Sequence, residues 1–423
     1  MKRHRKYLMI PLITSLLAGC SLPIMNDNTH SGSDNGIEGT QSSDEEDVSR
    51  QGEIQSGESL QETADIESSV MTGTETGTDS ASRSDENGTY YAYGTLSESG
   101  RAVYDAMYEA MRDFSSETTL PSTDEDEIDT AFNCVIADHP ELFYTNGFQY
   151  VKYTLAGVLK KIVMKPSYTM DSEEAGIRQK QIDEYTVKCL DGIADGSDDY
   201  DKIKYIYEYI IDNTDYSLDA EDSQNICSVF IGHSSVCQGY AKSFQYLLQK
   251  AGIESVTVNG KTDGNEPHAW NLVRSSGNWY YADVTWGDAQ YQKKQGDASE
   301  TSTDLINYDY LCVTTEDISK THTADSEIDL PECSADSDNY YIREGLYFTD
   351  VDKDRLEGIF KQAESDGRDE VRFRCSDSDV YDEMYSYLLD DQHIFDYIGG
   401  PGNSITYVSS PQACTFGFWI GNK

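Results

Sequence analysis

The chain has 423 residues, with 32 Lys and Arg against 77 Asp and Glu, which gives a net charge of −45 at pH 7. A molecule this negative repels phosphate backbones and anionic lipid surfaces, so its composition argues against nucleic acid and anionic membranes as ligands. The 335 residues from 89 onward are sufficient for two ordinary domains.

The first 20 residues have the pattern of an export signal. Four Lys and Arg residues lie within the first six positions, and an apolar stretch at 7–17 is too short to remain as a membrane span. The stretch ends in Leu17-Ala-Gly-Cys20, which resembles the lipobox of bacterial lipoproteins. That resemblance implies cleavage before Cys20 and a lipid on its thiol, hence an anchor on the extracellular face of the cell membrane. An ordinary secretory signal with an accidental cysteine is the alternative.

Residues 21–88 predict a disordered acidic tether. They hold sixteen acidic and two basic side chains and no Phe, Tyr or Trp. Such a segment cannot bury enough apolar surface to offset the entropy lost on ordering. We therefore expect it to separate the lipid anchor from a folded body that begins at residue 89.

Periodicity predicts helices and strands in the first part of that body. Apolar residues at helical spacing indicate helices at 97–117, 172–193 and 200–212, and alternation indicates strands near 150–153 and 158–164. The tyrosines of the third helix are compatible with a sugar-binding platform, but we interpret them as half-buried packing.

The next elements carry the chemistry. A helix is expected from Cys237 to 251, ending at Gly252, followed by a strand at 256–258. Two strand-like runs at 268–273 and 279–284, joined at 275–278, form a predicted hairpin whose second arm can extend through 286. A polar loop at 288–305 is a candidate lid, and a further strand is expected at 308–313.

Residues 335–423 have the pattern of a smaller α/β unit, separate from a body at 89–334. The expected order is strand 340–348, helix 350–365 with Asp350 as its N-cap, strand 370–375, helix 380–389 and strands at 405–408 and 414–419. Asp350 also opens a stretch similar to a calcium loop, but Arg355 and Lys361 occupy the positions of the turn glycine and the bidentate glutamate. We therefore predict no metal site here.

Cys237 is the candidate nucleophile. A thiol reacts as thiolate, and a position at the start of a helix favours that charge because the first N–H groups lack partners within the helix. We expect Gly239 to leave room for a substrate and the backbone N–H of Cys237 to form half of an oxyanion hole.

His268 and Asp283 are the candidate base and its orienting carboxylate. A turn at 276–277 places His268 diagonal to Asp283 across the hairpin, and a turn at 275–276 places the two directly opposite. Both registers leave the side chains on one face, where the carboxylate supports the charged imidazole. Competing histidines are at 139, 233 and 322; the first precedes a proline in a turn, and the other two lack a partnered carboxylate pattern.

These three motifs, Cys237-Gln-Gly-Tyr-Ala, His268-Ala-Trp and Asp283-Val-Thr-Trp, resemble the transglutaminase-like superfamily over residues 200–315. The resemblance implies an α+β, papain-like core in which the helix carrying the cysteine packs on an antiparallel sheet. It further implies acyl transfer through a thioester at amide bonds, with Cys237 as nucleophile, His268 as base and Asp283 as orienter, and no cofactor.

One departure concerns the second oxyanion donor. Animal transglutaminases use a tryptophan upstream of the cysteine, but every tryptophan of this chain follows Cys237. Tyr216, expected at the end of the helix before the motif, is an alternative donor, and packing is the competing interpretation of that ring.

The sequence thus predicts an extracellular, lipid-anchored cysteine acyltransferase or hydrolase whose partner is a protein or peptide substrate at the cell surface. The alternatives are a cell-wall or protein peptidase of the same fold and a catalytically silent surface-binding lipoprotein. Disulfide pairing and buried thiols remain equal interpretations for the seven cysteines that have no assigned role: 134, 189, 227, 312, 333, 375 and 414.

Overall fold

The structure is a computed structural model that describes residues 2–6, 90–288, 306–326, 328–368, 370–398 and 405–420. The predicted tether, the lipidation position Cys20 and all but the first residue of the predicted lid lie outside these ranges. The predicted domain boundaries at 88/89 and 334/335 stay predictions.

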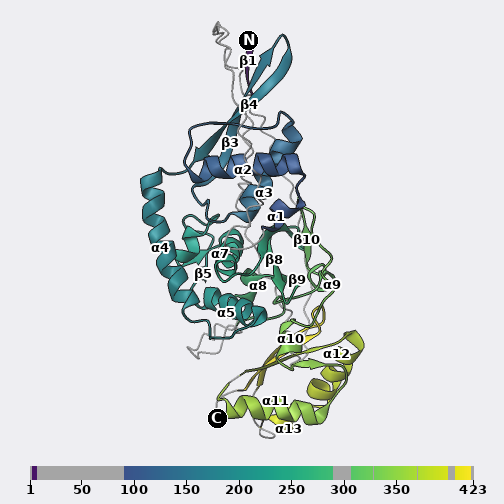
Figure 1. Cartoon of the computed structure of the whole chain (residues 1–423). Helices are drawn as coiled ribbons and strands as arrows, with labels where there is room; N and C mark the ends of the chain where they lie inside the picture. Colours follow the sequence, from purple (N-terminus) through teal and green to yellow (C-terminus); the bar gives the residue numbers. More distant parts are fainter. Residues whose placement is uncertain are drawn as a thin grey trace, which may run out of the picture.

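The N-terminal part combines a long hairpin with helices that precede it in the chain (Figure 1). Strands β3 (Thr145–Leu155) and β4 (Val158–Tyr168) form the hairpin, with β1 (Lys2–Lys6) beside β3 and β2 (Thr118–Thr119) beside β4. The cleavage predicted before Cys20 would remove β1 and leave β3 as an edge strand. The helices are α1 (Tyr91–Thr95), α2 (Glu98–Arg112) and α3 (Glu125–Asp138).

A helical layer follows. Its elements are α4 (Ser172–Leu190), α5 (Asp199–Asp212), β5 (Asp215–Tyr216), α6 (Cys227–Phe230), β6 (Ser234–Ser235) and α7 (Cys237–Lys250). The predicted helices at 172–193, 200–212 and 237–251 are confirmed. Tyr200 and Tyr207 of α5 are buried at 2 % and 0 % exposure, as expected of packing residues.

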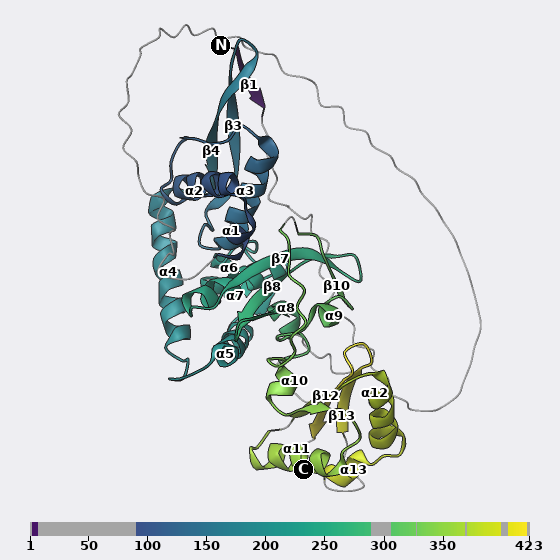
Figure 2. The ribbon, with the colours of Figure 1, turned by 45° about the vertical axis from the view of Figure 1, so that its right-hand side comes forward.

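The central sheet has the order β10-β7-β8-β9 and is antiparallel throughout. Its strands are β7 (Ser255–Thr262), β8 (Pro267–Ser275), β9 (Asn278–Ala282) and β10 (His322–Ala324). α7 packs on β7 and β8, and Figure 2 shows this helix lying against the sheet. The α+β core expected from the sequence, a helix that begins with the cysteine on an antiparallel sheet, is therefore present.

The hairpin of β8 and β9 uses one of the two registers that the sequence allowed. Ser275 pairs with Asn278 and Asn271 with Ala282, so the turn is Ser276-Gly277. Both turn residues have positive φ, 51° and 84°, the backbone that two-residue hairpin loops favour. The expected extension of the second arm to 286 is wrong, because the chain leaves the strand after Ala282 and enters the short helix α8 (Val284–Gly287).

The strand expected at 308–313 is also wrong. Residues 306–313 form no strand beyond a single bridge between Tyr281 and Val313. The apolar residues that suggested a strand are instead buried in the core as irregular chain, with Leu311, Cys312 and Val313 at 1 % exposure or less. Two bonds between Tyr281 and Val313 satisfy the backbone there. Helix α9 (Thr315–Ile318) follows.

The C-terminal unit has its own sheet, in the order β11-β12-β14-β13. Its elements are α10 (Tyr340–Arg343), β11 (Tyr347–Phe348), α11 (Lys353–Ser365), β12 (Glu370–Cys375), α12 (Ser378–Tyr385), the π-helical turn η1 (Ser386–Asp390), α13 (Ile394–Tyr397), β13 (Ile405–Ser410) and β14 (Thr415–Ile420). The strand expected at 340–348 is wrong over its first part, where α10 forms. Asp352, not Asp350, caps α11.

Two hydrophobic cores support this arrangement. The larger runs from Ala92 to Cys333 and joins the N-terminal part to the central sheet, and the smaller runs from Phe348 to Phe418. Asp309 connects the two regions, because its carboxylate accepts hydrogen bonds from the hydroxyls of Tyr341 (2.5 Å) and Thr415 (3.0 Å).

Part of the acidic excess has a structural use. Six helices of the described part begin with an Asp N-cap whose carboxylate accepts backbone N–H groups of the first turn: Asp124, Asp171, Asp198, Asp283, Asp352 and Asp377.

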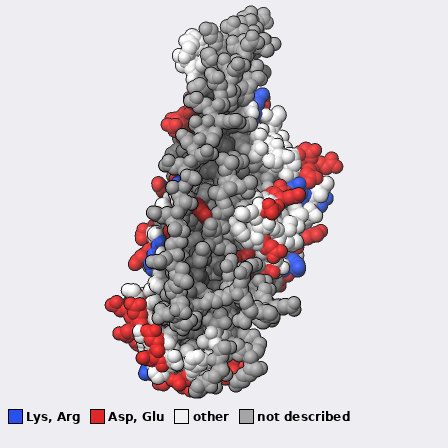
Figure 3. All heavy atoms as spheres, turned by 180° about the vertical axis from the view of Figure 1, so that it is seen from behind, with Lys and Arg blue, Asp and Glu red and all other residues white. Residues whose placement is uncertain are grey.

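The surface remains acidic, and on the face in Figure 3 Asp and Glu predominate over Lys and Arg among the described residues. Among the described residues, no helix combines the length and apolar character that a membrane span requires.

Candidate active site

Cys237 is the first residue of α7, as the sequence predicted. The preceding N-cap residue is Val236, whose side chain caps no backbone N–H of the first turn. The thiol therefore lies where the positive end of the helix dipole is not neutralised by a capping carboxylate. Cys237 is 8 % exposed, so the positive end of the helix dipole acts on its thiol in a largely desolvated environment.

Side-chain hydrogen bonds fix α7 against the sheet and the neighbouring loops. The amide Nδ2 of Asn271 on β8 donates to the carbonyl of Ala241 at 2.9 Å. The hydroxyl of Tyr240 lies 2.8 Å from the carbonyl oxygen of Thr214 and 2.6 Å from Oδ2 of Asp288. The bond from Asn271 fixes the position of the helix that begins with Cys237 relative to the strand that carries His268. The bonds of Tyr240 fix the same helix to the loops on either side of it.

Gly239 has a different role from the one expected. A Cβ atom at this position would lie 2.1 Å from Oγ of Ser235, 2.4 Å from Oγ of Ser228 and 3.0 Å from the carbonyl of Ser223. The two hydroxyls are hydrogen bonded to each other at 2.7 Å. The missing side chain makes room for close internal packing under α7, and not for an approaching substrate.

His268 and Asp283 are hydrogen bonded, with 2.6 Å between Nε2 of the imidazole and Oδ2 of the carboxylate. His268 lies on β8 and is 3 % exposed, and Asp283 is fully buried. Asp283 ends its strand and caps α8, because its Oδ1 accepts the N–H groups of Thr285 (2.9 Å) and Trp286 (3.0 Å). The cap fixes the carboxylate so that the other oxygen faces the imidazole.

The environment keeps Asp283 ionised. Burial by itself raises the pKa of a carboxyl group, but the charge of His268 and hydrogen bonds from His268 and His322 outweigh it, so the pKa of Asp283 lies well below its usual range. A permanently charged carboxylate at Nε2 stabilises the protonated form of the imidazole. Nδ1, on the other side of the ring, takes no part in the hydrogen bond to Asp283.

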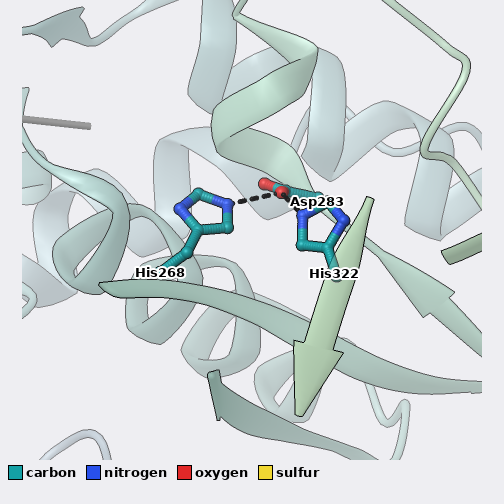
Figure 4. A group of neighbouring side chains, drawn as sticks. All are labelled: His268, Asp283 and His322. Atoms are coloured by element: carbon teal, nitrogen blue, oxygen red, sulfur yellow. Dashed lines mark hydrogen bonds and ion pairs between the residues drawn. The ribbon is translucent and has the colours of Figure 1, made fainter. Parts of the chain in front are cut away.

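The structure adds one residue that sequence reasoning rejected. His322 on β10 places its Nε2 3.0 Å from the same Oδ2 of Asp283 (Figure 4). The expectation that this histidine lacks a partnered carboxylate is therefore wrong. β10 is only three residues long and joins the sheet 39 positions after Asp283, so no local periodicity could have indicated the contact.

The other competing histidines lie elsewhere. Nδ1 of His139 pairs with Glu141 at 2.6 Å, and its ring stacks on Tyr108. His233 has a positive φ of 52° and lies near the ring of Tyr185. His139 and His233 thus contact side chains other than those of His268 and Asp283, in agreement with their rejection as base.

His268, Asp283 and His322 are the three described residues whose donor atoms group closely enough to hold a metal ion, all within 4.8 Å of one another. The two N–O distances of 2.6 and 3.0 Å are those of hydrogen bonds. Ligands at about 2.0–2.2 Å from a tetrahedral zinc ion would lie farther apart. The geometry therefore fits a hydrogen-bonded group better than a metal centre.

Tyr216 lies close to the cysteine helix but not where the sequence placed it. α5 ends at Asp212, and Tyr216 belongs to β5, which pairs in parallel with β6. Tyr216 is the partner of Ser235, two residues before Cys237, and its ring centroid is 6.3 Å from that of Tyr240. The expectation that Tyr216 ends a helix is wrong, but the residue does lie close to the start of α7.

Comparisons with known proteins find matches to part of this chain. Residues 188–284 match the model of the transglutaminase-like superfamily. The kyphoscoliosis peptidases of Mus musculus and Homo sapiens are 27 % and 28 % identical over 113 and 105 residues, which cover 23 % and 21 % of this chain and 17 % and 16 % of those proteins. The chain thus matches less than a fifth of the length of these curated relatives.

Solved structures also align with the chain. A crystal structure of a TGase matches with 14 % identity and a TM-score of 0.25, over 38 % of this chain and 50 % of that one. The periplasmic domain of TgpA from Pseudomonas aeruginosa matches with 15 % identity and a TM-score of 0.21, over 30 % and 55 %. The family match at 188–284 includes Cys237, His268 and Asp283, so the segment that carries the candidate triad is similar to the transglutaminase-like superfamily.

Proposed function

We propose that this protein is a cysteine acyltransferase or hydrolase that acts on protein or peptide amides through a thioester on Cys237. The observation that carries the proposal is the 2.6 Å bond from Nε2 of the buried His268 to Oδ2 of Asp283, on a strand that packs against the helix beginning with Cys237. A structural histidine requires neither a permanently charged partner nor a place beside a cysteine helix.

The proposed reaction forms a thioester on Cys237 and then breaks it. The Cys237 thiolate attacks the amide carbonyl carbon, and the N–H groups at the start of α7 stabilise the negative oxygen that forms. The imidazolium of His268 gives its proton to the leaving amine as the C–N bond breaks, which leaves a thioester. His268 then takes a proton from the attacking water or amine, and the thiolate is released.

The second oxyanion donor in this proposal is Tyr216. It is supported by the pairing of β5 with β6, which brings the residue to the chain segment that leads directly into Cys237. A phenolic O–H can donate to an oxyanion as an indole N–H does. A Tyr216→Phe variant should lose turnover while retaining the alkylation rate of Cys237.

Hydrolysis is a specific alternative to amine transfer. The two curated relatives are named peptidases, which favours water as the acceptor. Both outcomes use the same thioester, so the acceptor distinguishes them. We further propose an extracellular location through the lipid on Cys20, supported by the sequence pattern of the first 20 residues.

The first test is selective alkylation. Brief treatment of the native protein with iodoacetamide, followed by peptide mass spectrometry, should modify Cys237 before the other cysteines, and His268→Ala should remove that preference. Cys227 is the internal control, because it is also the first residue of a helix but burial raises its pKa to about 11. Equal slow labelling of both thiols would contradict the proposal.

The second test identifies the acceptor. Casein with a fluorescent amine reports transfer, and release of new amino termini from casein or purified cell wall reports hydrolysis, with Cys237→Ala as the control in each assay. Activity in either assay that Cys237→Ala abolishes supports the enzyme. A Cys237→Ala variant that preserves every activity and phenotype would point instead to a silent surface-binding protein.

A further inference from the structure

Oδ2 of Asp283 accepts two hydrogen bonds from imidazoles. Nε2 of His268 lies at 2.6 Å and Nε2 of His322 at 3.0 Å, and the two ring centroids are 5.3 Å apart. All three side chains are fully buried. A triad requires one histidine on this carboxylate, so the second needs its own explanation.

We propose that His322 is a positioning residue that shares the negative charge of Asp283 between two imidazoles and so sets how strongly His268 holds its proton. This inference rests on the proposed function, in which His268 exchanges a proton with Cys237. The active group would then contain four residues, drawn from α7, β8, the cap of α8 and β10.

The tautomer of His322 follows from its other ring nitrogen. Oγ1 of Thr321 lies 2.8 Å from Nδ1 of His322 and 3.5 Å from the carbonyl of Ile318. The hydroxyl has one proton, and the closer acceptor is Nδ1, so Thr321 donates to the ring. Nε2 then carries a proton and donates a hydrogen bond to Oδ2 of Asp283.

The ring of His322 is held in this orientation by its surroundings. β10 pairs with β7, where His322 is opposite Thr262. The centroid of the imidazole lies 4.4 Å from that of Trp286, 4.9 Å from that of Trp270 and 5.6 Å from that of Tyr310. Such an aromatic enclosure excludes water, so no solvent molecule shares the role of second donor on Asp283.

The electrostatic consequence has a definite sign. A donor on Oδ2 withdraws part of the charge that the carboxylate offers to His268. Without His322, Asp283 has one hydrogen bond fewer and binds the imidazolium of His268 more tightly. His268 would then keep its proton to higher pH and release it less readily in catalysis. The other titratable groups in contact with these two rings are Asp283, bonded to both, and Tyr310, whose ring centroid lies 5.6 Å from that of His322.

The test measures the titration of His268 by NMR, in protein with ¹³C-labelled histidine and a Cys237→Ala background that removes coupling to the thiol. His322→Leu should move the midpoint of His268 upward by about one pH unit, the size expected when a carboxylate loses one hydrogen bond. His322→Gln, whose amide can still donate to Oδ2, should restore most of the original midpoint. An unchanged or lower midpoint in His322→Leu would overturn the proposal.

Two further variants keep the test decisive if His322→Leu does not fold. Thr321→Val removes the hydroxyl that fixes the tautomer of His322, and it should move the midpoint in the same direction by a smaller amount. His139→Leu is the matched control, since it removes a buried histidine with its own carboxylate partner, Glu141, and should leave His268 unchanged. Thr321→Val without any shift would count against the proposal.

The readout separates this inference from the proposed function. If Cys237 is not selectively alkylated in the natural sequence, the enzyme proposal fails while the titration result still decides the role of His322. A chelator provides the remaining arm, because EDTA should leave the imidazole signals unchanged. Stoichiometric zinc in the purified protein, with signals of His268 and His322 that move on chelation, would identify a metal site and overturn the shared hydrogen bond.

Discussion

Asp283 lies against His268 with 2.6 Å between Oδ2 and Nε2, while its other oxygen caps α8. One residue therefore ends a strand, begins a helix and orients the imidazole. The carboxylate can stay fully buried and charged because each of its oxygens takes part in two hydrogen bonds. Oδ1 accepts the two N–H groups of the cap, and Oδ2 is bonded to the two imidazoles. The position of the pair of His268 and Asp283 is thus a consequence of how the second arm of the hairpin ends.

Asp283→Asn should separate these roles. The amide oxygen can keep the two N–H bonds of the cap, but the NH₂ group would face both imidazoles, which then must accept at Nε2. His268 would carry its proton on Nδ1, the wrong tautomer for a base. Corresponding changes in serine proteases reduce turnover by roughly 10⁴-fold, and we expect a loss of about 10³–10⁴-fold here.

Turnover and thermal unfolding together check this prediction. Asp283→Ala is the companion variant, because it also removes the cap and should lose about 1 kcal/mol more stability than Asp283→Asn. Near-normal turnover in Asp283→Asn would show that the carboxylate does not control the tautomer of His268.

Several parts of the site could be read from the sequence because they depend on local rules. The helix from Cys237 follows from apolar residues at helical spacing and ends at Gly252, whose φ is +81°. The sequence allows two registers for the hairpin, and both leave the two side chains on one face; the structure uses the Ser276-Gly277 turn, whose residues both have positive φ. These features place His268 and Asp283 on one face without any knowledge of the rest of the fold.

The remaining parts depend on tertiary contacts. His322 reaches Asp283 through β10, a strand too short to show alternation. The run around Leu311 has the apolar character of a strand, but it is buried without partners for a ladder. The sequence predicts that Gly239 leaves room for a substrate, whereas the structure places two serine hydroxyls where its side chain would be. Sequence identifies such positions but not their neighbours.

Gly239→Ala should destabilise the protein. The new methyl group would overlap the hydroxyls of Ser235 and Ser228, and a carbonyl at 3.0 Å prevents a simple shift. Overpacking of this kind typically costs about 1–3 kcal/mol. The matched control is Gly176→Ala, also within a helix, where a Cβ meets no atom within 4 Å and the change should stabilise by about 0.5–1 kcal/mol. Urea unfolding of both variants measures the difference, and equal effects would contradict the packing role.

The cysteines should remain thiols. All eight in the described part are buried, and no disulfide joins them. Burial raises the pKa of the Cys189 and Cys375 thiols to about 12, which protects them from oxidation in the native state. Alkylation in denaturant without reductant should therefore modify eight cysteines besides Cys20. Cys375 and Cys414 are neighbours, because the backbone N–H of Cys375 donates to the carbonyl of Cys414. Non-reducing peptide mapping tests this pair, and a crosslinked peptide that contains both cysteines would refute the prediction.

Asp138 should make stability depend on pH. Burial raises the pKa of this fully buried carboxyl to about 6, although hydrogen bonds from Ala92, Tyr93 and Tyr104 favour its charged form. A raised pKa means that the folded protein binds the proton more tightly than the unfolded chain. The contribution is fully present below pH 4 and is lost as pH rises to about 6, which amounts to about 3 kcal/mol at 1.36 kcal/mol per unit.

Urea unfolding of the natural sequence and of Asp138→Asn at pH 4, 5, 6 and 7 isolates this group. The difference in unfolding free energy between the two proteins should shrink as pH rises, because the variant cannot ionise. Asp138→Asn should also be less stable at every pH, since one amide oxygen cannot accept all three donors. A difference that grows with pH would mean that the three hydrogen bonds dominate burial and hold the carboxylate ionised in the fold.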